Sequence, residues 1–297
     1  MLNSAALASL AGAATNLADG LAEAGVGEGA ASASDGFFLA LLAVVQGLTE
    51  FLPISSSGHL VLSQHLFGLG HAPLALDAAL HVGTLLSVVI VYRADLIELV
   101  TGLFRGRWQE PALIVLATVP VAAIGLLYED AIESAFGDPR FAAGCLLGTA
   151  VILLLGEWGR RRSIGRPAGQ AATRLTLGRA LVVGLCQCLA ILPGISRSGT
   201  TIAAGLLVGL EPRAAARFSF LLSIPAVGGA AVLKVPELLD GGAPNAPSPV
   251  ALLGAVLLSA FVGWIALRFL LAFLGRGAFA WFSVYCAVVG GLCLVLL

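Results

Sequence analysis

Long apolar runs, separated by short polar segments, account for most of this chain. A helix needs about 20 mostly apolar residues to cross the hydrocarbon core of a membrane. Six runs reach this length: residues 74–92, 111–128, 141–158, 214–235, 249–271 and 278–297. The pattern predicts an all-α integral membrane fold with six spanning helices.

Two further apolar regions are interrupted by polar residues near their centres. The first, about 37–70, contains Pro53, three serines and Gly58, and the second, about 179–210, contains a Pro-Gly-Ile-Ser-Arg-Ser-Gly stretch. Each region leaves two apolar pieces that are too short to span and too apolar for a surface loop. Irregular backbone is tolerated at membrane depth only where protein or a watery cavity surrounds it. We therefore predict two re-entrant helix–loop–helix hairpins.

The two interrupted regions resemble each other. Residues 46–58 read QGLTEFLPISSSG and residues 187–199 read QCLAILPGISRSG, sharing Gln-x-Leu, Leu-Pro and Ile-Ser-x-Ser-Gly with one residue shifted around the proline. Each region is followed by three predicted spans. The chain therefore reads as one membrane domain, 36–297, built from two repeats at about 36–158 and 179–297. Because each repeat has an odd number of spans, the second must be inverted.

The basic residues support an alternation of loops between two sides of the membrane. Joining the spans in order places 13 of the 16 basic residues on one side. These are Arg93, Arg105, Arg107, Arg160, Arg161, Arg162, Arg166, Arg174, Arg179, Arg213, Arg217, Arg268 and Arg276. The positive-inside rule assigns this side to the cytoplasm and the acidic 129–138 loop to the outside. The two hairpins then enter from opposite faces, and their tips are expected to meet near the middle of the membrane, as in inverted-repeat transport folds.

The composition excludes a soluble fold and a nucleic-acid partner. The chain is 59% hydrophobic and 11% charged, with a mean hydropathy of +0.99, whereas soluble domains carry about 25% charged residues. Its formal net charge is −1, and no basic patch with interleaved aromatic residues occurs. The five cysteines lie in apolar stretches without a metal-type pair, which is typical of small buried hydrophobes.

Residues 1–35 differ from the rest of the chain. They are rich in Ala, Gly and Ser and contain acidic residues but no Lys or Arg. A secretory signal begins with basic residues, so we interpret this segment as a loose, flexible or partly helical tail without an assigned function.

The hairpin tips would bring many hydrogen-bonding groups together. The first hairpin contributes Gln46, Glu50, Ser55, Ser56, Ser57 and His59, and the second contributes Gln187, Ser196, Arg197, Ser198, Thr200 and Thr201. An intramembrane Arg costs at least about 2.5 kcal/mol on insertion scales, which a pairing with Glu50 would partly offset. Such an ion pair could simply join the hairpins. That reading leaves the clustered hydroxyls and the histidine unexplained.

The same residues suit an oxyanion. Gly58 and Gly199 allow tight turns and close approach of the backbone, and the helices that start beside them present free N–H groups. Arg197 adds a planar fork that matches phosphate oxygens, while Glu50 and His59 can transfer protons or hold a metal. We infer a site for phosphate or pyrophosphate.

These motifs resemble the bacterial undecaprenyl-pyrophosphate phosphatase family, which is linked to bacitracin resistance. The family pattern is (Glu/Gln)-x-x-x-Glu running into Pro-x-Ser-Ser-x-Gly-His, followed at a distance by Pro-Gly-x-Ser-Arg-Ser-x-x-Thr. This chain has Gln46 and Glu50, then PISSSGH at 53–59 and PGISRSGTT at 193–201. The resemblance covers about residues 36–297.

The resemblance implies that the terminal phosphate is removed from undecaprenyl pyrophosphate, giving undecaprenyl phosphate and inorganic phosphate. This step recycles the lipid carrier of cell-wall synthesis. The family implies a multi-pass protein of the bacterial inner membrane, a site open to the periplasmic face and a divalent cation, Mg²⁺ or Ca²⁺. Its functional positions fall here on Glu50, His59, Ser55, Ser56, Arg197, Ser196, Ser198 and Thr201. We expect Glu50, Ser56, His59 and Arg197 to be catalytic, and Gln46, Ser55, Ser57, Ser196, Ser198 and Thr201 to bind substrate.

One position departs from the family pattern. The family often has Glu where this chain has Gln46, so one carboxylate is missing. Mg²⁺ is commonly held by one or two carboxylates plus substrate phosphates. We therefore expect a cation at Glu50 to arrive together with the pyrophosphate.

Two mechanisms remain open from the sequence. In the first, Ser56 attacks the terminal phosphorus, and Glu50 or His59 takes its proton and later activates water. In the second, Glu50 or His59 activates water directly, without a phosphoserine. In both, Arg197 and the backbone N–H groups neutralise the charge of the transferring phosphoryl group.

The other histidines receive no catalytic role. Asp77 and His81 are four residues apart and share a helix face, which favours a structural pair. His65 and His71 are assigned no role, and the arginine run 160–162 is expected to set the topology.

Two other functions were weighed. Lipid phosphatases of the acid-phosphatase type need a Lys-x6-Arg-Pro stretch and a later Ser-Arg-x5-His, but the only lysine is Lys234 and no histidine follows Arg197. A transporter or flippase for a lipid phosphate or anion would use the same paired hairpins. The apolar surface could also support a homodimer, although no helix face is singled out.

Overall fold

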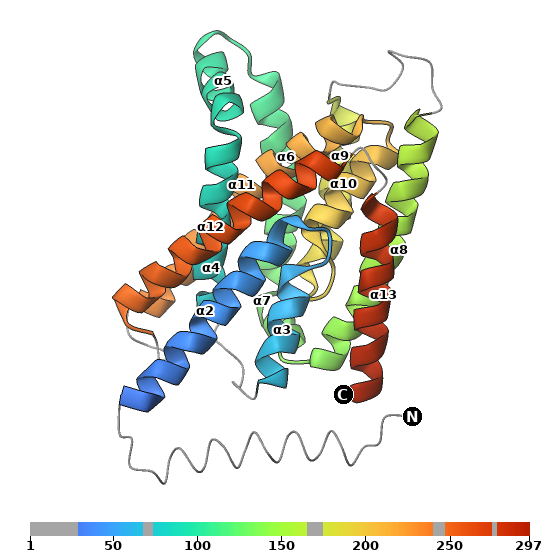
Figure 1. Ribbon diagram of the computed structural model, residues 1–297. Coiled ribbons are helices and arrows are strands. Elements are labelled where there is room, and N and C mark those ends of the chain that lie inside the picture. The colour runs from blue at the N-terminus through green and yellow to red at the C-terminus, as the bar shows by residue number, and fades with distance from the viewer. Residues whose placement is uncertain (1–28, 68–73, 165–174, 240–246, 275–277) are drawn as a thin grey trace. The chain divides into compact units, whose positions relative to one another are not determined.

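The computed structural model describes residues 29–67, 74–164, 175–239, 247–274 and 278–297, and every regular element in these ranges is helical (Figure 1). The chain divides into two compact units, Met1–Leu41 and Leu42–Leu297. The boundary falls inside the first described helix, α2 (Gly29–Phe51). Most of the predicted N-terminal tail, residues 1–28, lies outside the described residues. The second unit holds the candidate site, and the description below concerns that unit.

The remaining helices are α3 (Ser56–Leu66), α4 (Leu74–Val91), α5 (Arg93–Phe104), α6 (Gln109–Leu127), α7 (Glu129–Phe136), α8 (Pro139–Ile164), α9 (Leu177–Gln187), the 3₁₀ turn η1 (Cys188–Ile191), α10 (Arg197–Leu207), α11 (Pro212–Leu239), α12 (Pro249–Phe273) and α13 (Ala278–Leu296). Six of these helices, α4, α6, α8, α11, α12 and α13, follow the six predicted spans closely. Five of them, α6, α8, α11, α12 and α13, are long and apolar enough to cross a membrane. The remaining predicted span, α4, passes the same test only together with α5, from which it is bent by 77°.

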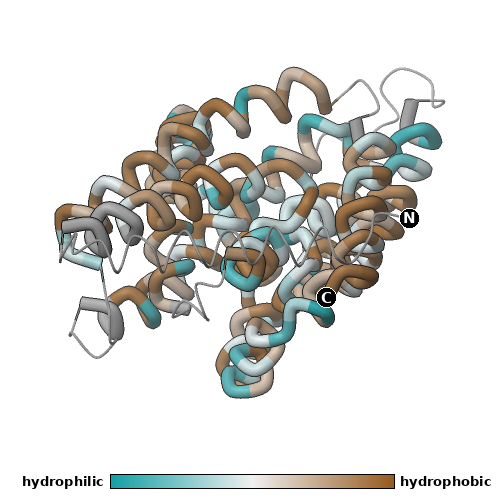
Figure 2. Tube along the Cα trace, turned by 60° about the horizontal axis from the view of Figure 1, so that its bottom comes forward, coloured by the Kyte–Doolittle hydropathy of each residue, from teal (hydrophilic) through white to brown (hydrophobic). Residues whose placement is uncertain are grey.

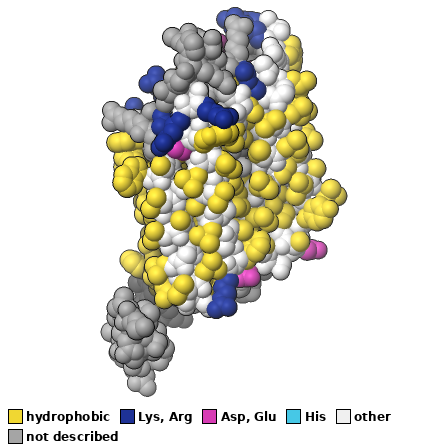
Figure 3. Space-filling view, turned by 90° about the vertical axis from the view of Figure 1, so that its right-hand side faces the viewer, with side chains coloured by type: hydrophobic (Ala, Val, Ile, Leu, Met, Phe, Trp, Pro, Cys, Tyr) yellow, Lys and Arg dark blue, Asp and Glu magenta, His cyan; other side chains and the backbone are white. Residues whose placement is uncertain are grey.

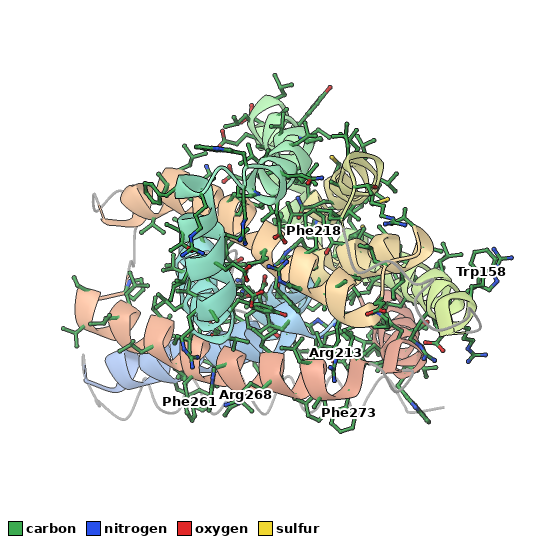
Figure 4. The ribbon with its side chains drawn as sticks, turned by 90° about the horizontal axis from the view of Figure 1, so that it is seen from above. Trp158, Arg213, Phe218, Phe261, Arg268 and Phe273 are labelled. Atoms are coloured by element: carbon green, nitrogen blue, oxygen red, sulfur yellow. The ribbon has the colours of Figure 1, made fainter. Side chains whose placement is uncertain are left out.

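Apolar side chains cover the outside of the helices as well as the interior. Figure 2 shows that apolar residues predominate along the helices. Seen from above, Phe218 lies among the helices, whereas Trp158, Phe261 and Phe273 point outward (Figure 4). In Figure 3, apolar side chains cover the middle of the visible face and most basic side chains gather at its upper end. Because a water-soluble protein would not expose so many large apolar residues, the chain is a multi-pass membrane protein, as predicted.

Each interrupted helix pair packs against spans from the other half of the chain. Helix α9 packs on α6, and α10 packs on α8. A Cβ added at Gly184 of α9 would lie 2.6 Å from the carbonyl oxygen of Ala117, and one at Gly47 of α2 would lie 2.8 Å from that of Ser259 in α12. The two halves are therefore interleaved, which places both interrupted loops in the interior.

Candidate functional site

The first loop joins α2 to α3 and turns sharply at Ser55. This residue has φ +69° and is the N-cap of α3, where its hydroxyl accepts a hydrogen bond from the backbone N–H of Gly58 at 3.3 Å. The Oγ atoms of Ser55 and Ser57 lie 3.2 Å apart. The turn directs the next residue, Ser56, back towards the end of α2.

The second loop repeats this local geometry. Ser196 is the N-cap of α10, and its hydroxyl accepts from the N–H of Gly199 at 3.0 Å. Its Oγ lies 3.3 Å from that of Ser198. The sequence similarity between the two regions therefore reflects a shared loop structure.

The two loops are in direct contact. A Cβ added to Gly58 would lie 2.8 Å from the Cα of Gly194, so only glycine leaves room for the second loop at this point. The hydroxyl of Ser198 reaches the carbonyl oxygen of Leu52 at 3.4 Å. Residues 136 and 146 positions apart along the chain are thus in contact.

Glu50 lies at the centre of the site and is only 8% exposed. Its Oε1 accepts from Nη2 of Arg197 at 2.5 Å. Its Oε2 accepts from Oγ of Ser56 at 2.6 Å and from Nε2 of Gln46 at 3.1 Å. The ion pair expected from the sequence therefore joins the two loops, and it also places a serine hydroxyl on the carboxylate.

His81 of α4 is a further partner of Glu50. Its Nε2 lies 3.3 Å from Oε2 of Glu50, and its Nδ1 lies 2.7 Å from the carbonyl oxygen of Asp77. The sequence analysis paired His81 with Asp77 and kept it out of the site. The Asp77 carboxylate instead accepts from Gln64 at 3.2 Å. Only the packing of α4 beside the loops brings His81 to Glu50, and no sequence spacing signals this contact.

A cavity of about 290 Å³ opens beside these groups. Its polar lining residues are Glu50, Ser55, Ser56, Ser57, Asp77, His81, Gln187, Ser196, Arg197 and Lys234. The rest of the wall is apolar and comes from α6, α7, the η1 region and one face of α11. Lys234 itself forms an ion pair with Glu129, the first residue of α7. A charged, hydroxyl-rich end and an apolar wall suit a ligand with an anionic head and an apolar chain.

Gln187 faces this cavity with unused hydrogen-bonding capacity. The residue is 1% exposed, and neither its Oε1 nor its Nε2 has a hydrogen-bond partner among the described residues. Buried amide groups are normally satisfied. Gln187 is therefore available to a ligand, although the sequence analysis did not place it in the binding set.

The other predicted residues take different positions. Gln46 is fully buried beside Glu50, with its Oε1 unpartnered among the described residues. Thr201 is buried behind Arg197, where its hydroxyl meets that of Ser219 at 2.6 Å. His59 is half-buried and lies outside the described lining of the cavity. Its Nδ1 faces the Ser55 carbonyl oxygen at 2.7 Å, and its Nε2 faces the Tyr285 hydroxyl at 2.8 Å.

The residues present fit a divalent cation whose ligands are mainly the phosphate oxygens of a substrate. Within the described ranges, no group of three or more His, Cys, Asp or Glu side chains could hold a metal ion. Both oxygens of Glu50 already accept hydrogen bonds from Arg197, Ser56 and Gln46. Mg²⁺ and Ca²⁺ prefer several oxygen ligands. The donor set is thus insufficient for a cation held by the protein alone, but sufficient for one held mainly by phosphate oxygens.

The arrangement can bind an anion and activate a hydroxyl. Arg197 and the free N–H groups at the starts of α3 and α10 attract negative charge, and the carboxylate of Glu50 can accept the Ser56 proton. The fold and the site together define an integral membrane protein with a buried polar centre, suited to an anion, between two interrupted helix pairs.

Comparison with known proteins identifies the family. The model of the bacitracin resistance protein BacA family matches residues 39–292, and the chain belongs to this family. It is 42% identical over 274 residues to the undecaprenyl-diphosphatase of Desulfatibacillum aliphaticivorans, covering 86% of this chain and 96% of the relative. It is 43% identical over 249 residues to the undecaprenyl-diphosphatase of Moorella thermoacetica, covering 82% and 91%. The undecaprenyl-diphosphatase of Korarchaeum cryptofilum is 42% identical over 264 residues, covering 84% and 95%.

Proposed function

We propose that this protein hydrolyses undecaprenyl diphosphate to undecaprenyl phosphate and inorganic phosphate, and so recycles the lipid carrier of cell-wall synthesis. The observation that carries the proposal is the contact between the Ser56 hydroxyl and the Glu50 carboxylate beside Arg197, at the polar end of an apolar-walled cavity. The names of the relatives agree with this activity.

In the first step, Oγ of Ser56 attacks the terminal phosphorus of the diphosphate. The Oγ–phosphorus bond forms while the bond from this phosphorus to the bridging oxygen breaks, and the lipid monophosphate leaves. Glu50 takes the Ser56 proton, because its Oε2 lies 2.6 Å from Oγ. Arg197 neutralises the charge on the transferring group, since it lines the cavity and its guanidinium can bind two oxygens.

In the second step, water attacks the phosphorus of the phosphoserine. The phosphorus–Oγ bond breaks, Oγ takes its proton back from Glu50, and inorganic phosphate leaves as H₂PO₄⁻, which carries both protons of the attacking water. Glu50 is a better candidate than His59 for these transfers, because both ring nitrogens of His59 are engaged, by the Ser55 carbonyl oxygen and the Tyr285 hydroxyl, and His59 lies outside the described cavity lining. Direct attack by water, activated by Glu50, is the rival pathway.

The surrounding polar residues bind the diphosphate. Ser55, Ser57 and Ser196 line the cavity, and Gln187 offers an unpartnered amide. Gln46, Ser198 and Thr201 support this layer from behind, through Glu50, the Leu52 carbonyl and Ser219 respectively. Glu50, together with the diphosphate oxygens, would hold a divalent cation, Mg²⁺ or Ca²⁺. When bound, it neutralises phosphate charge.

We also propose the membrane arrangement. The pairs α2–α3 and α9–α10 are re-entrant hairpins of two inverted repeats, and α4, α6, α8, α11, α12 and α13 are the six spans. Support comes from the matching N-caps, the interleaved packing and the burial of nearly all of α10. The protein lies in the bacterial inner membrane with the cavity open to the periplasm, where acidic α7 and Lys234 border it. A homodimer is compatible with the exposed apolar surface.

Phosphate release from undecaprenyl diphosphate by the purified protein in detergent tests the proposal directly. We expect release by the unmodified protein and its loss in Arg197→Ala. Transfer of the lipid across vesicles without phosphate release would overturn the hydrolase and favour a transporter. A phosphoenzyme trapped at Ser56 would support the first pathway, and a fully active Ser56→Ala variant would exclude it.

A further inference from the structure

His59 connects α13 to the backbone of the first loop. Its Nδ1 lies 2.7 Å from the carbonyl oxygen of Ser55, and its Nε2 lies 2.8 Å from the hydroxyl of Tyr285. The two rings are stacked, with centroids 5.6 Å apart and planes 9° apart. Because a carbonyl oxygen only accepts, Nδ1 carries the proton, and Nε2 of the neutral ring accepts from Tyr285. The contacts therefore run from Tyr285 through His59 to Ser55.

The residue at the end of this chain of contacts is conformationally strained. Ser55 has φ +69° and ψ 98°, and it is the only non-glycine residue with positive φ in the described part of the chain. Such a conformation persists only when surrounding contacts enforce it. The next residue is Ser56, whose Oγ lies 2.6 Å from Oε2 of Glu50. The backbone of Ser55 therefore sets the direction of the Ser56 hydroxyl.

The second loop serves as an internal comparison. Its N-cap, Ser196, makes the same cap bond as Ser55 but has φ −71° and ψ 119°, an ordinary extended conformation. The residue that corresponds to His59 is Thr200, whose buried hydroxyl has no partner among the described residues. The loop that lacks a candidate nucleophile thus lacks both the strain and the contact that would hold it.

General support of the loop does not explain this difference. Each loop is also braced by one neighbouring helix at an equivalent carbonyl group. Thr149 of α8 donates to the Gly194 carbonyl at 2.7 Å, and the Cys286 thiol of α13 lies 3.9 Å from the Pro53 carbonyl. Thr149 also accepts from the N–H of Ser196 at 2.9 Å, but among the described residues only the first loop has a side-chain contact, through His59, at the carbonyl oxygen of its N-cap residue.

We propose that Tyr285 and His59 form a clamp that holds Ser55 in its left-handed conformation and thereby aims the Ser56 hydroxyl at Glu50. Both are positioning residues, because they act through Ser55 and lie outside the described cavity lining. The proposal rests on the proposed function, in which Ser56 is the nucleophile. It assigns His59 a role that needs no proton transfer.

The first test separates positioning from acid–base chemistry. Tyr285→Phe keeps the stacked ring but removes the hydroxyl, and we expect kcat to fall about tenfold, the value of one hydrogen bond, with KM nearly unchanged. His59→Asn keeps an N–H donor for the Ser55 carbonyl, so its kcat should match that of Tyr285→Phe. His59→Ala has no such donor and should have a much lower kcat. If His59→Asn is as inactive as His59→Ala and loses one limb of the pH–rate profile, His59 transfers protons and the clamp is refuted. Tyr128→Phe, at an exposed tyrosine, is the matched control and should leave kcat unchanged.

The second test asks whether the clamp acts on the strain. Glycine adopts positive φ freely. In a Ser55→Gly background the turn should therefore depend less on the contacts made by His59 and Tyr285. We expect Tyr285→Phe to reduce both kcat and the melting temperature less in this background than in the unmodified protein. Strictly additive effects in both measurements would overturn the proposal. The melting temperature can be measured without catalytic turnover. If the unmodified protein releases no phosphate, the proposed function is refuted, but the melting temperatures of the variants still test the clamp.

Discussion

Replacing Glu50 by glutamine preserves the shape of the side chain and removes its charge. In the structure, this carboxylate accepts hydrogen bonds from Ser56 and Arg197 at 2.6 and 2.5 Å. Loss of a general base typically lowers a rate by about 10²–10⁴-fold. The amide can still accept at one atom, but its NH₂ group would face either Arg197 or Ser56 as a donor. We therefore expect kcat to fall about a thousandfold, near the middle of that range.

The same substitution also affects stability. Removing one partner of a fully buried ion pair costs about 3–5 kcal/mol. The Arg197 side chain is 15% exposed and lines the cavity, so water can solvate it in part. We expect the free energy of unfolding to fall by about 1–3 kcal/mol, below the fully buried value.

A matched control separates the two effects. Glu157 is also buried, at 5% exposure, and its carboxylate pairs with Arg160 and Arg161. Glu157→Gln should lower the melting temperature but leave kcat of the folded protein within about twofold, because this pair lies outside the described cavity lining. Phosphate release is measured in detergent together with melting of the same samples. Glu50→Gln with a kcat within threefold of the unmodified protein would refute the role of Glu50 as the base.

Three further outcomes follow from the same geometry. Arg197→Lys should lower kcat/KM by about a hundredfold, because an ammonium group cannot replace the fork that reaches Glu50 and the substrate oxygens; near-normal kcat/KM would show that only the charge matters. Gly83→Ala should lower the melting temperature strongly, because its Cβ would lie 2.3 Å from the carbonyl oxygen of Val256, whereas Gly144→Ala, with no heavy atom within 4 Å, should not; equal melting temperatures would contradict the close packing of α4 on α12. Treatment with EDTA should abolish phosphate release without changing the melting temperature of the substrate-free protein; a large melting shift would reveal a resident cation.

The hydrophobic pattern was sufficient to locate the six long helices and the two interrupted regions. All six predicted runs coincide with helices, and the similarity between residues 46–58 and 187–199 appears in the structure as two equivalent N-caps. These features are local, because run length, proline and Ser-x-Ser-Gly act within a few residues of their position. The family assignment, which rests on the same loops, is confirmed.

The sequence analysis did not predict α5 and α7, which it treated as parts of connecting segments. Helix α5 bends by 77° from α4 at Tyr92, and Arg217 of α11 pairs with Asp95 of α5 and Glu110 of α6. Helix α7 is short and has no buried residue. Neither helix has the long apolar run on which the prediction depended.

His59 and His81 show why the site itself was only partly predictable. The motif placed His59 next to the serines, but helical geometry turns its ring towards α13. His81 belongs to no motif, yet it reaches Glu50 because α4 packs beside the loop. Sequence proximity determines which residues share a turn, whereas helix packing determines which side chains face the same cavity.

The two repeats contribute unequally to the chemistry although their loops are built alike. The first loop supplies the carboxylate, the candidate nucleophile and the strained turn, and the second supplies Arg197 on an unstrained one. Position 56 of the first Ser-x-Ser-Gly is a serine, and the equivalent position 197 is the arginine. The similar loops share one scaffold, and under the proposed function the difference at this position lets the first loop donate the nucleophile while the second stabilises the charge on the transferring phosphoryl group. Exchanging the two residues, Ser56→Arg with Arg197→Ser, should keep a serine and an arginine in the site but abolish phosphate release, because a serine side chain at position 197 is much shorter than the arginine whose Nη2 reaches Glu50.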